Sequence, residues 1–146
     1  MRRVNIYAES ETAAFRKKKR MAGYVLELVD SENRTETTRD GWFEMDGTWN
    51  EVVMKAFIIA LGRMTMPCEI HLHTQNRAIL DMIGNNMAGW KEKGFRNAKG
   101  EPIRNAMLWQ DLANECANHT VIPESGDHSF RSWMMETMKK RRLADV

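Results

Sequence analysis

The stretch that decides the fold is MIGNNMAGWKEKGFRNAKGEPIRNAMLWQDL, residues 82–112. It reads as a helix end, a basic loop and the start of a second helix. Residues 90–105 carry five basic and two acidic side chains, a local charge of +3. Gly100 and Pro102 exclude a helix in this loop, and Asn105 is a typical N-cap for the helix that follows. Aromatic residues interleaved with cations are typical of nucleic-acid contacts, or of a solvated loop with two buried anchors.

The anchors of this stretch are Gly84, Trp90-Lys91, Gly94-Phe95, Gly100, Pro102-Ile103-Arg104-Asn105, Leu108-Trp109-Gln110 and Leu112. Their order and spacing closely resemble those of the bacterial ribonuclease H family. In that family the segment is a basic protrusion, and we call residues 90–105 the handle. The resemblance implies that the handle binds nucleic acid through Trp90, Lys91, Lys93, Phe95, Arg96, Lys99 and Arg104, with Trp90 and Phe95 holding it in shape.

Composition limits the classes of protein to which this chain can belong. The 146 residues fit one domain, residues 1–146, and the 42% apolar and 29% charged fractions are ordinary for a globular protein. The net charge is only +2, so affinity for a polyanion must come from local clustering. No apolar run is long enough to span a bilayer, and the N-terminus does not resemble a signal peptide. Cys68 and Cys116 lack redox or zinc spacing. We therefore expect a cytoplasmic protein with reduced thiols and no membrane partner.

Hydrophobic periodicity predicts the elements in order. We expect strands at residues 4–10, 22–30, 34–45, 68–73 and 119–122, and helices at residues 48–64, 77–91, 107–118 and 130–142. Thr48 and Glu51 form a predicted capping box. The basic run from Arg16 to Arg20 is predicted to be a solvated turn, or alternatively a secondary phosphate contact. This order matches an α/β (α+β) ribonuclease H-like fold, a five-stranded mixed sheet flanked by helices.

The catalytic positions that the resemblance implies are degenerate. Ribonuclease H enzymes cut the RNA strand of an RNA–DNA hybrid with two divalent ions held by carboxylates. The four family positions map to Glu9, Val53, Gln75 and Asp127, beside which His128 matches a histidine that assists product release in some members. Because Val53 and Gln75 supply no carboxylate, we expect no metal and no other cofactor; Mg²⁺ would be expected only with an intact carboxylate site. His71 and His73 share one strand face without a third ligand, and structural roles are predicted for both.

Three functions remain open from the sequence. The first is a pseudo-nuclease that binds an RNA–DNA hybrid or duplex weakly through the handle without cleavage. The second is a protein-binding scaffold from a mobile element or phage that inhibits a host nuclease or defence complex, which implies a protein partner. The third is a weakly active ribonuclease H. The retained basic handle favours the first, and the sequence carries no signal of oligomeric state.

Overall fold

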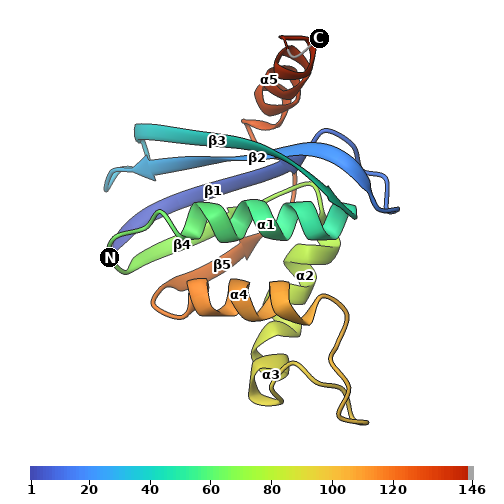
Figure 1. Cartoon of the computed structure of the whole chain (residues 1–146). Coiled ribbons are helices and arrows are strands. Elements are labelled where there is room, and N and C mark those ends of the chain that lie inside the picture. The colour runs from blue at the N-terminus through green and yellow to red at the C-terminus, as the bar shows by residue number, and fades with distance from the viewer. Residues whose placement is uncertain (145–146) are drawn as a thin grey trace.

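In the computed structural model, which describes residues 1–144, a five-stranded mixed sheet forms the centre of the protein (Figure 1). Its strands are β1 (Arg2–Ser10), β2 (Lys18–Val29), β3 (Thr35–Gly47), β4 (Cys68–His73) and β5 (Thr120–Glu124). They lie in the order β3-β2-β1-β4-β5. The first three strands form an antiparallel meander, whereas β4 is parallel to β1 and β5 is parallel to β4. The predicted mixed sheet is confirmed.

Helices cover both faces of the sheet (Figure 1). They are α1 (Trp49–Leu61), α2 (Arg77–Asn85), α3 (Met87–Glu92), α4 (Ala106–Cys116) and α5 (Arg131–Ala144). Alternation along β1 explains the two layers. Val4 and Ile6 belong to the large core that contains α1 and α4, whereas Tyr7 belongs to the smaller core with Met134 and Met138 of α5. Within residues 1–144 no helix is long and apolar enough to cross a membrane.

Helix α1 is built as its sequence predicts. Thr48 caps it: the Glu51 amide donates to Thr48 Oγ1 at 3.2 Å, and the Thr48 amide donates to Glu51 Oε1 at 2.8 Å. Val53 and Phe57 on its inner face are both 0% exposed. The helix ends at Leu61, with Gly62 as its C-cap, rather than at residue 64.

The prediction of a solvated basic turn at residues 16–20 is wrong at its second half. Strand β2 begins at Lys18, which pairs with Gly47 of β3. Arg20 is 0% exposed, although Arg16 and Lys17 remain exposed. The Arg20 guanidinium donates to the carbonyl oxygens of Thr12 and Arg16, so the segment between β1 and β2 folds over it. Arg20 is therefore no phosphate contact.

Element boundaries differ elsewhere from the predicted ones. The single helix expected at residues 77–91 is divided into α2 and α3 at Asn86, whose backbone has φ −121° and ψ −34°. Gly84, Asn85 and Asn86 are poor helix formers, which explains the break. Strand β5 begins at Thr120, one residue later than predicted, and ends at Glu124, two residues later. Cys68 and Cys116 are buried free thiols, as expected.

Candidate active site and nucleic-acid interface

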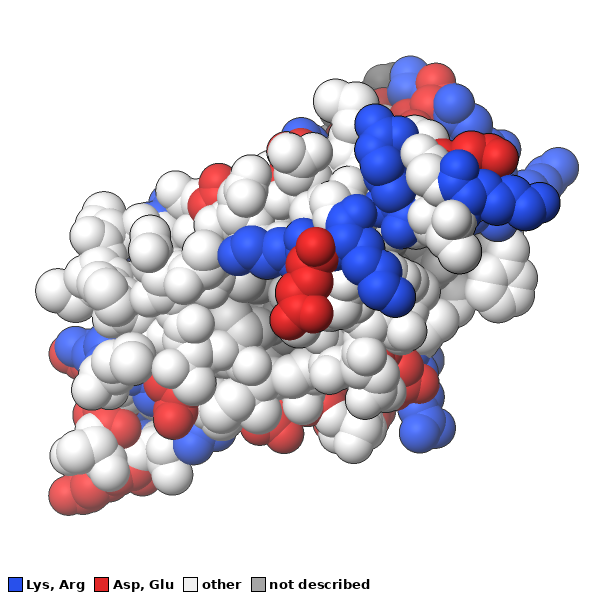
Figure 2. Space-filling model, turned by 90° about the horizontal axis from the view of Figure 1, so that it is seen from below, with Lys and Arg blue, Asp and Glu red and all other residues white. Residues whose placement is uncertain are grey.

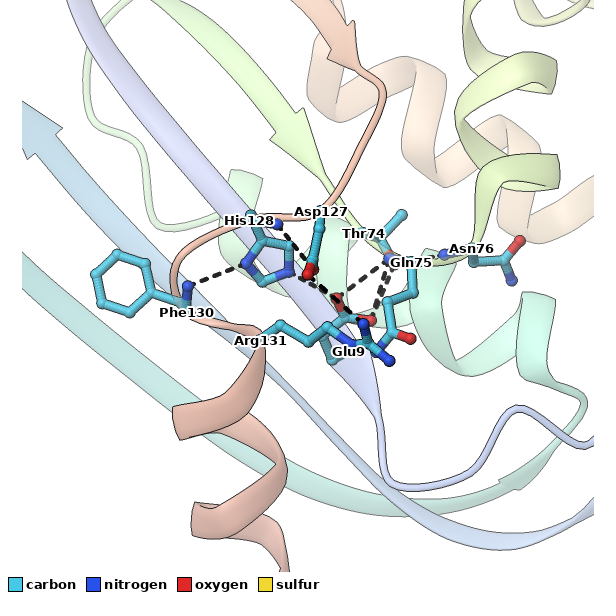
Figure 3. A network of polar contacts seen from close by, with 8 residues as sticks. All are labelled: Glu9, Thr74, Gln75, Asn76, Asp127, His128, Phe130 and Arg131. Carbon is cyan, nitrogen blue, oxygen red and sulfur yellow. Dashed lines mark hydrogen bonds and ion pairs between the residues drawn. The ribbon is translucent and has the colours of Figure 1, made fainter.

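Glu9 is the centre of the candidate site. It lies near the end of β1, in the middle of the sheet, and is only 1% exposed. The backbone amide of Gln75 donates to both carboxylate oxygens, at 3.2 and 3.1 Å. Thr74 Oγ1 lies 3.4 Å from Oε1 and His128 Nε2 lies 2.6 Å from Oε2 (Figure 3). The carboxylate is therefore enclosed by protein donors from the segment that follows β4 and from the loop before α5.

His128 is held at both ring nitrogens. Its Nδ1 accepts a hydrogen bond from the Phe130 amide at 3.2 Å, so the ring proton lies on Nε2 and is donated to Glu9. The His128 side chain is 3% exposed, and its ring lies 4.9 Å from that of Tyr7. The ring is thus held beside Glu9 in this structure, and the role that the resemblance implied for His128 stays a prediction.

The other mapped positions do not complete a metal site. Val53 is a fully buried core residue of α1. Gln75 supplies a neutral amide side chain beside the cleft, and its backbone amide already binds Glu9. The Asp127 side chain is 68% exposed, and its Oδ1 accepts from the His128 amide at 2.9 Å. Within residues 1–144 no three His, Cys, Asp or Glu side chains are grouped so as to hold a metal ion. The donor set does not fit two divalent ions, which need several carboxylate oxygens.

A second polar network lies on the same sheet face. Glu27 accepts hydrogen bonds from Asn5, Tyr7 and Thr35 at 2.9, 2.7 and 2.5 Å. Burial acts to raise the pKa of Glu27, but these hydrogen bonds outweigh it and hold the pKa below its ordinary value. His73 stacks on Tyr7 with 4.6 Å between ring centroids. Burial, together with the nearby His128, lowers the pKa of His73 to about 4.

The histidines on β4 have structural partners. His73 Nε2 lies 3.1 Å from Asn5 Oδ1, and the two ring nitrogens of His71 contact Glu69 and Glu124. Each histidine thus links β4 to a neighbouring strand. The structural roles predicted for the pair agree with these contacts.

Two aromatic residues fix the base of the handle. Phe95 is 8% exposed and adopts a positive φ of 60° next to Gly94 at 66°. Its amide donates to the Trp90 carbonyl at 2.8 Å, and its carbonyl accepts from the Ile103 amide at 3.0 Å. Trp90 packs edge-on against Trp109 of α4, with 5.0 Å between centroids. Phe95 is thus a buried anchor, so its ring is not available to stack on a base.

The cations of the handle are exposed. Lys91, Lys93, Arg96, Lys99 and Arg104 all lie on the surface. Arg96 donates to the Gly100 carbonyl at 2.8 Å, which closes the turn. Among the described residues, none of the three lysines has an ion-pair partner within 4.0 Å. The handle is at the lower end of the molecule in Figure 1, and Figure 2 shows Lys and Arg side chains gathered over one part of the face seen from below.

The structure adds residues that the sequence reasoning missed. A cleft of about 400 Å³ beside Glu9 is lined by Thr74, Gln75, Arg77, Ser125, Asp127 and Arg131. Arg77 follows the mapped position Gln75 by two residues, and Arg131 follows Asp127 by four. This proximity to mapped positions was a usable signal, although only the fold brings both arginines to one cleft.

The comparisons with known proteins agree on one family. The family model described as RNase H matches residues 2–124. Ribonuclease H of Rhizobium meliloti (strain 1021) is 33% identical over 115 residues, which cover 70% of this chain and 74% of that protein. Ribonuclease HI of Xylella fastidiosa (strain 9a5c) is 37% identical over 78 residues, 53% of this chain and 52% of the relative. This chain thus spans about half the length of several curated relatives that it matches.

A solved structure shares the fold over the whole chain. The crystal structure of LC9-RNase H1, described as a type 1 RNase H with the type 2 active-site motif, superposes with a TM-score of 0.75. It is 19% identical and the match covers 100% of this chain and 74% of that one. At that identity the likeness establishes the arrangement of the elements.

Proposed function

Because the chain belongs to the ribonuclease H family, we propose that it binds an RNA–DNA hybrid or a related duplex without cleaving it. The observation that carries this proposal is the enclosed Glu9 carboxylate, which His128 Nε2 approaches to 2.6 Å. A metal ion bound at Glu9 would have to displace His128 and break its hydrogen bond. The family's nucleic-acid-binding segment, in contrast, is present as an exposed basic handle.

The absence of cleavage follows from the charge of the site. Two-metal hydrolysis needs carboxylates to hold both ions, one to activate water and one to stabilise the leaving oxygen. Val53 and Gln75 provide no charge, and Asp127 is exposed with Arg131 3.6 Å away. Binding and cleavage are thus separable in this chain.

Binding is assigned to the handle because its cations are exposed on a rigid base. The buried ring of Phe95 and the Trp90–Trp109 contact hold the loop against α4. Engaging about three phosphates would give a log–log salt slope of about −3 on a duplex. Such a contact produces weak, salt-sensitive affinity that carries no sequence preference.

A cleavage assay tests the catalytic part of the proposal. The purified protein is incubated with a labelled RNA–DNA hybrid and either Mg²⁺ or Mn²⁺, and we expect no product. An authentic ribonuclease H serves as the positive control. Metal-dependent product that Glu9→Gln abolishes would instead establish the weakly active ribonuclease H alternative, because a contaminating nuclease would not respond to that variant.

Fluorescence anisotropy against salt tests the binding part. Lys91→Ala with Lys93→Ala removes two handle cations that have no ion-pair partner among the described residues, so the hybrid should bind more weakly and the slope should flatten by about two units. Arg16→Ala with Lys17→Ala removes the same charge from the exposed loop before β2 and should have less effect. If the wild-type protein does not bind the hybrid at low salt, the proposal fails, and the protein-binding scaffold becomes the better hypothesis.

A further inference from the structure

The cleft beside Glu9 has the charge of an anion site. Of the side chains that line it, Arg77 and Arg131 are cationic and only Asp127 is acidic. Glu9 does not line the cleft: it is buried, and its carboxylate accepts hydrogen bonds from the Gln75 amide and from His128. A carboxylate-lined nuclease site repels phosphate until metal ions neutralise it. In this chain two cationic side chains and one acidic side chain line the cleft, so the charge of its lining is net positive without a metal ion.

Neither arginine is held tightly by another side chain. Arg131 starts α5, and Figure 3 shows its side chain reaching toward Glu9 and Gln75, which agrees with both Gln75 and Arg131 lining the cleft. Its closest approach to Asp127 is 3.6 Å, longer than a hydrogen bond, and both side chains are about half exposed or more. Such a pair contributes little, on the order of 0–1 kcal/mol. Arg77 starts α2 and has no hydrogen-bond or ion-pair partner among residues 1–144.

The cleft adjoins the handle. Asn76, next to Gln75, donates to Asn50 Oδ1 at 2.8 Å. Asn50 and Ile79 then line a second cavity of about 200 Å³, whose other wall includes Arg104 of the handle. The first turn of α2 thus contributes to both hollows, Arg77 to the cleft and Ile79 to the second cavity. A nucleic-acid backbone lying along the handle would reach the arginine cleft within the same surface.

From this arrangement we infer that the cleft binds a backbone phosphate through Arg77 and Arg131, in place of metal ions. Arginine suits this role because its planar guanidinium donates two parallel hydrogen bonds to phosphate oxygens. The inference rests on the proposed function, since it names a second contact for the same nucleic acid. It requires that binding be independent of divalent metal.

Two measurements test the inference. The anisotropy of a labelled hybrid is followed with EDTA and with Mg²⁺, and the wild-type affinity should be at least as high in EDTA. Because the two arginines share one phosphate, Arg77→Ala with Arg131→Ala should weaken binding and flatten the salt slope by about one unit. Arg34→Ala with Arg39→Ala removes the same charge from the β2–β3 turn and the edge strand β3, and should leave the slope near that of the wild type. Circular dichroism, and Arg77→Gln with Arg131→Gln, control for folding.

A second probe separates this inference from the proposed function. In ¹⁵N NMR titrations with inorganic phosphate, the amide signals of Gln75 and Gly126 should move in the wild type and stay in place in the arginine variant. If the hybrid binds but the arginine and control variants behave alike, the inference is overturned and the handle-based function stands. If the hybrid does not bind, the proposed function fails, and the phosphate titration alone decides: unmoved signals overturn the inference, whereas shifts lost in the variant support it.

Discussion

His128→Ala is the most informative perturbation of this protein. The substitution removes the hydrogen bond from Nε2 to the Glu9 carboxylate, both partners being 3% exposed or less. A hydrogen bond to a buried charged group contributes about 1.5–3 kcal/mol. Loss of the ring contact with Tyr7, at 4.9 Å, adds about 1 kcal/mol. Glu9 keeps the Gln75 amide, so we expect a total loss of about 3 kcal/mol and a Tm lowered by about 10 °C.

Urea unfolding followed by circular dichroism measures this loss. A double-mutant cycle with Glu9→Gln isolates the Glu9–His128 term, which should be about 1.5–2 kcal/mol. His119→Ala is the matched control, because it removes a histidine that accepts one neutral hydrogen bond from the Cys68 amide at 3.0 Å, and should lose about 1 kcal/mol. A His128→Ala loss no larger than that of His119→Ala, or a coupling energy near zero, would refute the idea that His128 takes the place of a metal ion at Glu9.

Two further outcomes are expected. Because burial and His128 lower the pKa of His73 from 6.5 to about 4, the unfolded chain binds a proton that the folded chain does not, and stability falls as the pH drops from about 6.5 toward 4. After discounting for solvent screening, urea unfolding should show a loss of about 1 kcal/mol at about pH 5 relative to pH 7; an unchanged pH dependence in His73→Gln would contradict this. The double variant Val53→Glu with Gln75→Asp should bind Mn²⁺ poorly, because His128 still contacts the Glu9 carboxylate. Adding His128→Ala should raise the affinity for Mn²⁺, measured by water-proton relaxation. Equal affinities in the two variants would argue against the idea that His128 prevents metal binding at Glu9.

Local patterns explain how much of the fold the sequence alone predicts. Alternation along residues 4–10 gives β1 its two faces, and the period of Val53 and Phe57 gives α1 its buried side. Capping at Thr48 is likewise encoded within four residues. Each of these signals lies within a single strand or a few helical turns, so residues that are close in the sequence are sufficient to predict the element. The loss of carboxylates at Val53 and Gln75 is also visible in the sequence, once the anchors of the handle set the register.

Contacts between distant segments required the tertiary structure. Glu9 and His128 are 119 residues apart; the family resemblance places both at one site, but only the fold shows that His128 Nε2 lies 2.6 Å from the Glu9 carboxylate. The burial of Arg20 depends on carbonyl groups of the loop that folds over it, so a local charge run reads as solvated. Arg77 and Arg131 are the first residues of different helices, α2 and α5. They line one cleft because β4 and β5 are parallel neighbours, so the segments that follow the two strands begin at the same end of the sheet. Periodicity determines which side of an element is buried, whereas strand order determines which side chains meet.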